Sequence, residues 1–533
     1  MLKPLLFLIL LQSVVADWQY LSRPDLSPPK LNITVPAAES VAPGYIFVAP
    51  YLGFEEGSAG PEHPGAYILR NDGDLVWSGV GYFGGWVADF GPADIDGNTV
   101  LRAFQGRLDV EHGRMYGDHI ILNDNYQTEE VFGTASHRMV SCHEFHIVGN
   151  GSSVLIETPV FVPADLTAYG GGVDEQNWIV NNGFQEIDLQ TGELLFEWYS
   201  LDHVVPKYSK FRLEADGPYS GRSSFDAWNY FHINSVDKDS EGNYLISARN
   251  YAAIFKIDGT DGSIIWQLGG SHGSNFTIPE DVNFAYQHDA RFRYRSEDGS
   301  IEHISFFDNA RHSVPGHEIS PFSRARFVEL DHERGTARAL HMYPAPDGLG
   351  AKSQGSVQLL QNSNVFVNWG QAGAVTEFAE NGTILYHAYL DSEPYKNVQS
   401  YRGFRAEWTG YSNEEPAVLA LMGQGGAVNI YVSWNGDTVT AIWRFYLHSP
   451  DGSFVQRLGE FRKRGFETRF ETLLGKGYEG PLVVAEALDR RGHSLRQSSP
   501  VPLEDVAPYR LHVQGASSGL ISGPDNTQQK LDL

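Results

Sequence analysis

Short alternations of apolar and polar residues, separated by Asp-Gly, Asn-Gly and similar turns, run through most of the chain. In one such stretch, Phe184, Glu186 and Asp188 alternate with Gln185 and Ile187. Successive side chains of a strand point to opposite faces, so this period of two predicts strands, and the turn pairs predict hairpins. Long runs with helical periodicity are absent. The pattern therefore predicts an all-β protein.

A hairpin unit recurs along the chain: a short strand, a turn rich in Asp, Asn, Thr or Gly, and an apolar strand that often ends in an aromatic residue. Its six copies lie near residues 67–78, 120–132, 184–198, 254–266, 327–341 and 375–387. A second hairpin unit, as in HINSVDKDSEGNYLISARN, alternates with the first. Two hairpins per repeat make a four-stranded blade, so we expect a six-bladed β-propeller over residues 41–401. The alternative is a generic array of β-sandwiches.

The segments on either side of the propeller differ in composition. Residues 402–510 contain strand, Asn-Gly turn and strand in succession (AVNIYVSWNGDTVTAIWRFYLHSPDG) and predict a small, fibronectin-like β-sandwich domain. Residues 17–40 contain four prolines, which favour an extended N-terminal strap, and residues 511–533 are expected to be a flexible C-terminal tail.

The first residues, MLKPLLFLILLQSVVADW, have the composition of a secretory signal peptide. Lys3 is followed by a short apolar run and then by small residues, so we expect residues 1–16 to be removed and the protein to be secreted. No later stretch approaches eighteen uninterrupted apolar residues, and no membrane anchor is expected. Four N-x-S/T sequons are predicted glycosylation sites: Asn32, Asn150, Asn275 and Asn381.

The chain is strongly acidic, with a net charge of −27 from 66 acidic and 39 basic residues. This charge argues against nucleic acid or an anionic membrane as a partner. An anionic ligand would need a local basic pocket. The single cysteine, Cys142, excludes an internal disulfide, so a large core must stabilise the fold.

Three histidines begin consecutive copies of the second hairpin unit: His143, His232 and His288. Equivalent positions in successive blades converge on the propeller axis, so these imidazoles are expected to meet at the channel. Arg311 lies on the strand that pairs back from His288, and arginine is suited to binding oxyanions. The pattern favours an anion site at the channel mouth, although each histidine could instead tie neighbouring blades together.

Several motifs resemble the arylsulfotransferase family, in its secreted fungal-type branch, over most of residues 45–400: FHINSVDKDSEGNYLISARN, WQLGGSHGSNF, YQHDARF, FFDNARH and NWGQAGAVTEF. The resemblance implies a six-bladed propeller that moves a sulfuryl group from an aryl sulfate to a phenolic acceptor through a histidine. Neither a nucleotide sulfate nor a cofactor is implied. By motif, His232, His288 and Arg311 match catalytic residues of the family.

Substrate-binding roles are expected for His143 from its place in the repeat, for Asn309 and His312 beside Arg311, and for Trp369, which could stack on an aryl ring. The sequence departs from the family at residues 351–373, where bacterial members carry their nucleophile, because this stretch contains no histidine. Either the alignment with the family is out of register over this stretch, or another residue such as His288 or His232 attacks, or this branch carries out different chemistry.

Two other functions remain open at this level. The protein could be a non-catalytic propeller that binds a glycan or a protein partner. It could also be a metal-dependent enzyme, because three imidazoles suit zinc or copper. No metal site is predicted, however, because no neighbouring carboxylate indicates one. The oligomeric state is not indicated by the sequence.

Overall fold

A computed structural model describes residues 17–54, 58, 60–173, 176–312, 318–391, 398–475 and 477–505. The predicted signal peptide and the predicted C-terminal tail lie outside these ranges. The chain divides into two compact units, Leu31–Tyr411 and a second unit that combines Met1–Lys30 with Ser412–Leu533. In the described ranges, none of the helices has the length and apolar character needed to cross a membrane.

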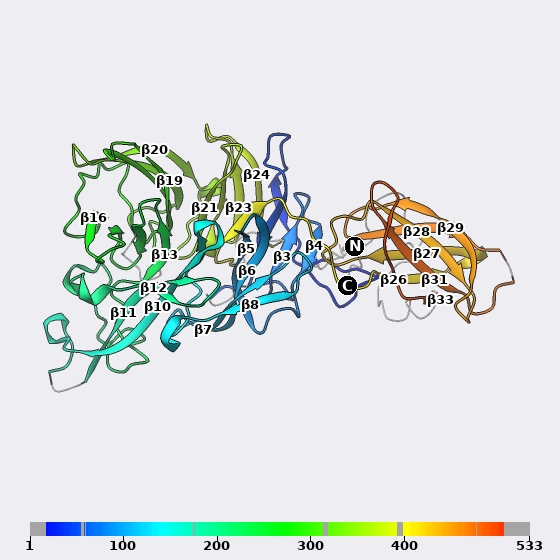
Figure 1. Ribbon diagram of the computed structural model, residues 1–533, viewed down its shortest axis with the longest axis horizontal. Coiled ribbons are helices and arrows are strands. Elements are labelled where there is room, and N and C mark those ends of the chain that lie inside the picture. The colour runs from blue at the N-terminus through cyan, green and yellow to red at the C-terminus, as the bar shows by residue number, and fades with distance from the viewer. Residues whose placement is uncertain are drawn as a thin grey trace, which may run out of the picture. The chain divides into compact units, whose positions relative to one another are not determined.

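The described strands of Leu31–Tyr411 form six sheets arranged as the blades of a β-propeller, which confirms the predicted fold class (Figure 1). In spatial order, the first three sheets are β25 (Gly403–Ala406), β2 (Tyr45–Val48), β3 (Tyr67–Leu69) and β4 (Leu75–Ser78); β5 (Trp86–Ile95), β6 (Asn98–Asp109), β7 (Arg114–Leu122) and β8 (Thr128–Phe132); and β9 (Phe145–Val148), β10 (Ser153–Ala164), β11 (Asn177–Asp188) and β12 (Leu194–Tyr199).

The other three are β13 (Ile233–Lys238), β14 (Tyr244–Ala248), β15 (Ala253–Ile257) and β16 (Ile264–Gly269); β17 (His288–Arg295), β18 (Ile301–Asp308), β19 (Arg324–Asp331) and β20 (Thr336–Pro344); and β21 (Ser356–Leu359), β22 (Val365–Asn368), β23 (Ala374–Phe378), β24 (Ile384–Tyr389) and β1 (Asn32–Val35).

Neighbouring blades pack through the apolar faces that the alternation predicts. Leu245 and Ile254 of the fourth blade share one core with Ile304, Phe306 and Val328 of the fifth. Both faces of a blade are therefore buried between its neighbours, and the strands are held by this packing rather than by any disulfide.

The ring closes by pairing two segments that are far apart in the sequence. Strand β25 runs antiparallel to β2, with Tyr45 opposite Ala406, and becomes the innermost strand of the first blade. The propeller thus continues past the predicted boundary at residue 401, because this pairing removes a free sheet edge. The predicted strap of residues 17–40 is also divided: the propeller unit begins at Leu31 and contains β1, while the described residues before Leu31 belong to the other unit.

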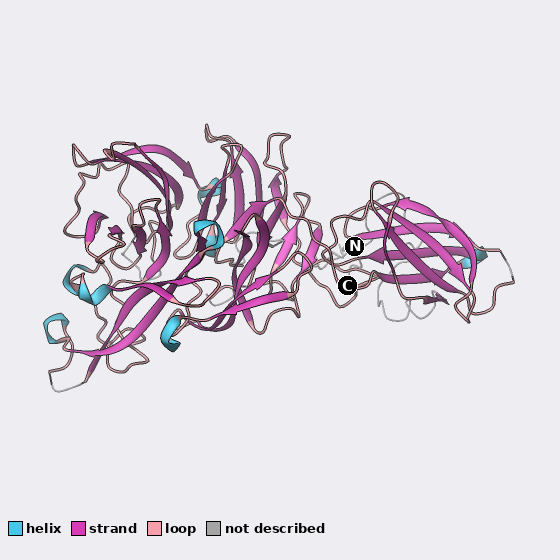
Figure 2. Ribbon diagram, viewed as in Figure 1, coloured by secondary structure: helices cyan, strands magenta, loops and turns pink. Residues whose placement is uncertain are grey.

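The second unit is a further sheet domain, built from β26 (Ala417–Met422), β27 (Ala427–Ser433), β28 (Ile442–His448), β29 (Phe454–Arg462), β30 (Glu467–Leu473), β31 (Leu482–Leu488), β32 (Ser494–Gln497) and β33 (Val501–Asp505) (Figure 2). Its strand order is β29-β28-β31-β33-β26-β27-β30, with β32 on β31. Ile430, Trp443 and Phe445 lie in its core, and Phe445 stacks on Phe470 with ring centroids 4.6 Å apart. Strands distant in the order therefore face one another across this core.

Candidate active site

A cavity of about 520 Å³ lies in the propeller where several inner strands begin. Four histidines line it: His143, His232, His288 and His312. Its aromatic wall consists of Tyr51, Phe54, Trp86, Phe211, Tyr219 and Tyr401, and its polar groups include Arg249, Lys352 and Gln354. The structure therefore brings the three register-equivalent histidines together, as the repeat predicts.

The inner strands explain how the histidines converge. His143 lies two residues before β9, His232 directly before β13, and His288 is the first residue of β17. His232 adopts a left-handed conformation with φ of +61°, which is strained for a residue with a Cβ. Such strain often occurs at functional sites, where the surrounding structure enforces it.

His232 and His143 form a close pair. Their rings meet edge to face with centroids 4.7 Å apart. His232 Nδ1 lies 2.8 Å from the side-chain amide of Asn229. Burial lowers the pKa of His232 well below its ordinary value, and the neighbouring His143 and Arg249 lower it further. His232 is therefore neutral near pH 7 and retains a ring nitrogen lone pair.

His288 is held at both ring nitrogens. Its Nδ1 lies 2.6 Å from Asn309 Oδ1 and donates to it, while its Nε2 accepts the backbone N–H of Gln354 at 3.1 Å. The Asn309 amide in turn donates to the carbonyls of Ala351 and Gln354. Burial, together with the charge of Arg249, lowers the pKa of His288 well below its ordinary value. With no free lone pair, His288 and Asn309 anchor the loop around Gln354.

The remaining predicted residues are in different places. His312 lies on the cavity wall between the rings of Phe211 and Tyr286. Arg311 is not among the residues that line the cavity. It lies against Gly350, and a Cβ added to that glycine would be 2.5 Å from Arg311 Nη1. Trp369 is fully buried in a core cluster with Phe307 and donates from Nε1 to Thr376 at 2.8 Å. Neither Arg311 nor Trp369 is thus placed to contact a ligand in this cavity.

Arg249 is the cavity arginine that sequence reasoning missed. It follows β14 directly, and its backbone N–H donates to the His232 carbonyl at 2.9 Å. Its Nη1 donates to Asn250 Oδ1 at 2.8 Å and its Nη2 to the Lys352 carbonyl at 2.9 Å. A signal for this position was present in the hairpin HINSVDKDSEGNYLISARN. Ile233 pairs with Ala248 in it, and this register places the next residue, Arg249, beside His232.

The Arg249 guanidinium is buried without a carboxylate partner among the described residues. The residue is 8% exposed, its Nε–H has no acceptor, and it forms no ion pair with any described residue. Burial lowers its pKa to about 10, so it remains a cation near pH 7. A buried, unpaired cation is costly, and an anion bound in the cavity would offset that cost.

A second set of charges joins the same inner strands. Arg402 donates from Nη1 to Glu144 at 2.8 Å and to Asp89 at 3.2 Å, and from Nη2 to the His143 carbonyl at 2.9 Å. Burial by itself would lower the pKa of Arg402, but Glu144, Asp89 and Asp289 raise it well above its ordinary value. This network holds the backbone of His143 in place.

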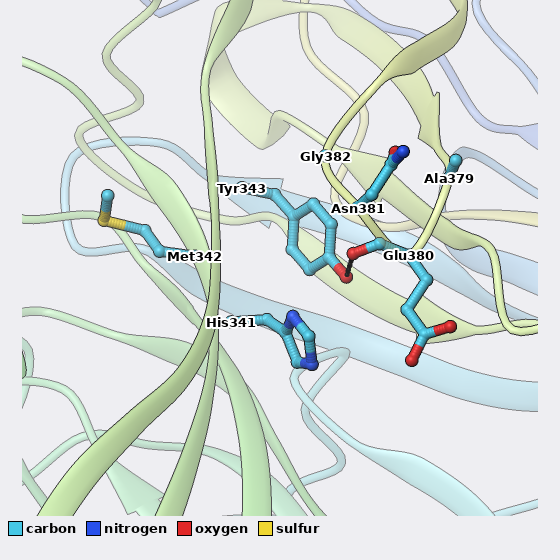
Figure 3. A pocket seen from close by; sticks show the side chains of 7 residues that line it. All are labelled: His341, Met342, Tyr343, Ala379, Glu380, Asn381 and Gly382. Atoms are coloured by element: carbon cyan, nitrogen blue, oxygen red, sulfur yellow. Dashed lines mark hydrogen bonds between the residues drawn. The ribbon is translucent and has the colours of Figure 1, made fainter.

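A second, more open pocket of about 540 Å³ lies between β20 and the turn that joins β23 to β24. Figure 3 shows the Tyr343 ring beside His341, with its hydroxyl donating to the Glu380 carbonyl at 3.0 Å. This pocket contains no arginine or lysine and none of the predicted catalytic residues. We therefore assign the candidate site to the histidine-lined cavity. In the described part of the chain, no three His, Cys, Asp or Glu side chains converge as metal ligands would.

In a comparison with known families, the model of a family described as "Arylsulfotransferase (ASST)" fits residues 91–390. No curated protein matches the chain. Among solved structures, a protein of unknown function from Bacteroides caccae is 10% identical, with 68% of this chain and 100% of that one covered and a TM-score of 0.38. The GH32 β-fructofuranosidase BmSUC1 of Bombyx mori is 11% identical, with 79% and 87% covered and a TM-score of 0.31. Likenesses this weak support no functional inference.

Proposed function

Because the chain belongs to the arylsulfotransferase (ASST) family, we propose that it moves a sulfuryl group from an aryl sulfate to a phenolic acceptor in the histidine-lined cavity, without a nucleotide sulfate. The observation that carries this proposal is Arg249, a buried cation that has no carboxylate partner among the described residues. It lies beside a neutral histidine, and this pairing suits the transfer of an anionic group.

Arg249 binds the sulfate oxygens in this proposal. Asn250 and the Lys352 carbonyl hold its two Nη groups, and the Nε–H has no acceptor among the described residues. A donor fixed before the substrate arrives stabilises charge that develops on the sulfuryl oxygens at no further cost of reorganisation. Arg249 thus takes the role that the resemblance implies for Arg311.

His232 is the proposed nucleophile. Its Nε2 makes no hydrogen bond to a described residue, whereas His288 Nε2 accepts the Gln354 N–H. Attack through Nε2 requires the tautomer of His232 that carries its proton on Nδ1. This nitrogen faces the Asn229 side-chain amide. The Asn229 side-chain oxygen is buried and has no described partner, so a turn of the amide would let it accept that proton. The stretch 351–373, which lacks histidine, reaches the cavity through Lys352, Ser353, Gln354 and Gln371.

The aromatic wall would receive the aryl rings of donor and acceptor. Trp86 and Tyr51 meet edge to face with centroids 5.2 Å apart, and Phe211, Tyr219 and Tyr401 complete the wall. Aromatic side chains bind a flat ring by stacking and edge contacts and exclude water from the reacting centre.

We also propose that the protein is a secreted glycoprotein of the fungal-type branch, following the signal-peptide pattern and the resemblance of its motifs. Asn150, Asn275 and Asn381 are exposed, which is compatible with glycosylation, while Asn32 is partly buried in β1. A sheet domain after the propeller is also compatible with that branch.

The test is to incubate the purified protein with 4-nitrophenyl sulfate, with and without a phenol acceptor. We expect phenol release that the acceptor accelerates, and a sulfonated His232 peptide by mass spectrometry when the acceptor is omitted. His232→Ala should lower the rate by at least about 10³-fold, since removing a nucleophile abolishes the covalent route. The exposed His493 supplies the matched control, and His493→Ala should react like the wild type.

Three other results would overturn parts of the proposal. Release that does not depend on the acceptor would indicate a sulfatase. An unchanged rate in His232→Ala would exclude His232 as the nucleophile. An absence of turnover with several donors would favour a non-catalytic propeller that binds a glycan or a protein.

A further inference from the structure

His143 forms part of the wall of two cavities. It lines the large cavity and also a small one of about 20 Å³ that contains Ser141 and Glu157. Its Nδ1 lies 2.6 Å from Ser141 Oγ and 3.6 Å from Glu157 Oε2, so this edge of the ring faces the small cavity. Its Nε2, on the opposite edge, makes no hydrogen bond with a described residue and is free for a ligand in the large cavity.

Glu157, on β10, is a buried carboxylate whose described basic neighbour is the imidazole of His143, 3.6 Å away. It is 2% exposed, and its Oε2 has no hydrogen-bond partner in the described residues. No described lysine or arginine lies within ion-pair distance of it. Ser141 Oγ and the Glu157 carboxylate are the acceptors on this edge of the ring, so Nδ1 carries a proton that faces them. The exchangeable proton of His143 is then the one on Nε2.

We propose that His143 is the general acid and base of the reaction and that Glu157 is its positioning residue; this assignment rests on the function proposed above. The edge-to-face contact of His143 with His232, at 4.7 Å, brings the two imidazoles to the same bound group. Glu157 lies outside the large cavity wall and acts only through His143.

In the first step, the His232 Nε2 lone pair forms a bond to sulfur while the bond from sulfur to the aryl oxygen breaks. The electron pair of that bond goes to the aryl oxygen, which takes the proton from His143 Nε2 and leaves as a phenol. In the second step, neutral His143 removes the acceptor's hydroxyl proton as that oxygen attacks sulfur. The bond between sulfur and nitrogen breaks, and its electron pair returns to His232.

Donors with different leaving groups test this assignment. The phenolate of 4-nitrophenyl sulfate leaves without help, whereas that of 4-methylphenyl sulfate needs a proton. We expect Glu157→Gln to lower kcat/KM about 10²-fold with the 4-methylphenyl donor and less than about threefold with the 4-nitrophenyl donor, because general acid catalysis assists mainly poor leaving groups. Glu130, which is exposed on β8, is the control, and Glu130→Gln should leave both rates unchanged.

A second variant keeps the test decisive if Glu157→Gln does not fold. His143→Gln should show the same selective loss, and circular dichroism melts would establish that each variant is folded. If Glu157→Gln does not fold, His143→Gln decides alone. Equal losses with both donors in a folded variant would overturn the assignment of His143 and Glu157 while leaving the proposed function standing. A wild-type protein inert toward both donors would instead overturn the proposed function.

Discussion

Arg249 and Arg402 are both buried in the centre of the propeller, yet their surroundings are opposite. Arg402 is enclosed by the carboxylates of Glu144, Asp89 and Asp289, and its pKa lies well above the ordinary value. Among the described residues, Arg249 has only an amide oxygen and a backbone carbonyl as acceptors, and burial lowers its pKa to about 10. The charge of one is neutralised within the fold, whereas that of the other is not.

This difference separates a structural cation from a binding cation. When one partner of a buried ion-pair network is removed, the remaining charges stay buried without a partner, and the protein is destabilised. Removing an uncompensated cation relieves an unfavourable burial but takes away the group that an anionic substrate needs. Replacing Arg402 should therefore mainly lower the stability of the protein, whereas replacing Arg249 should mainly lower its activity.

The largest effect on stability is expected at Arg402. Arg402→Met leaves Glu144, Asp89 and Asp289 without their shared partner and should lower the free energy of unfolding of the propeller by about 3–5 kcal/mol, measured by urea denaturation. The control is Arg338→Met, which breaks the exposed pair with Glu329 and should cost less than about 1 kcal/mol. Equal stability of the two variants would contradict the structural role of Arg402.

At Arg249 the larger effect should be on catalysis. Arg249→Met should lower kcat/KM for an aryl sulfate about 10²–10³-fold, the usual loss when one preorganised donor is removed. The free energy of unfolding should stay the same or rise. Inorganic sulfate should raise the unfolding midpoint of the wild type, by mass action on the folded state, but not that of the variant. A variant that is destabilised and still responds to sulfate would show that Arg249 is structural.

The smallest effect concerns pH. The pKa of His232 is lower in the folded state than in the unfolded chain, so the unfolded state binds more protons as the pH falls below 6.5. Between pH 8 and pH 5.5 this should remove about 1.4 kcal/mol of stability per such histidine. His232→Gln should abolish its share of that loss, measured by urea denaturation at both pH values. An unchanged pH dependence would mean that His232 is not held neutral.

Much of the fold could be predicted because its signals are local. Alternation and turn residues act within one hairpin, and six copies of one unit predict six blades. The convergence of His143, His232 and His288 also followed from the sequence, because equivalent positions in successive blades meet at the axis. The closing pair of β25 with β2 could not be read in this way, since Tyr45 and Ala406 lie far apart in the chain.

The sequence by itself determined the class of fold, the number of blades and the three histidines at the channel. The tertiary structure alone decided which charged and aromatic residues reach the cavity. Arg249 lines it while Arg311 lies against Gly350, and Trp369 is buried in the core. It also decided that both nitrogens of His288 are occupied and that Glu157 faces His143. These outcomes depend on contacts between side chains of different blades, and the hydrophobic pattern of each blade does not specify them.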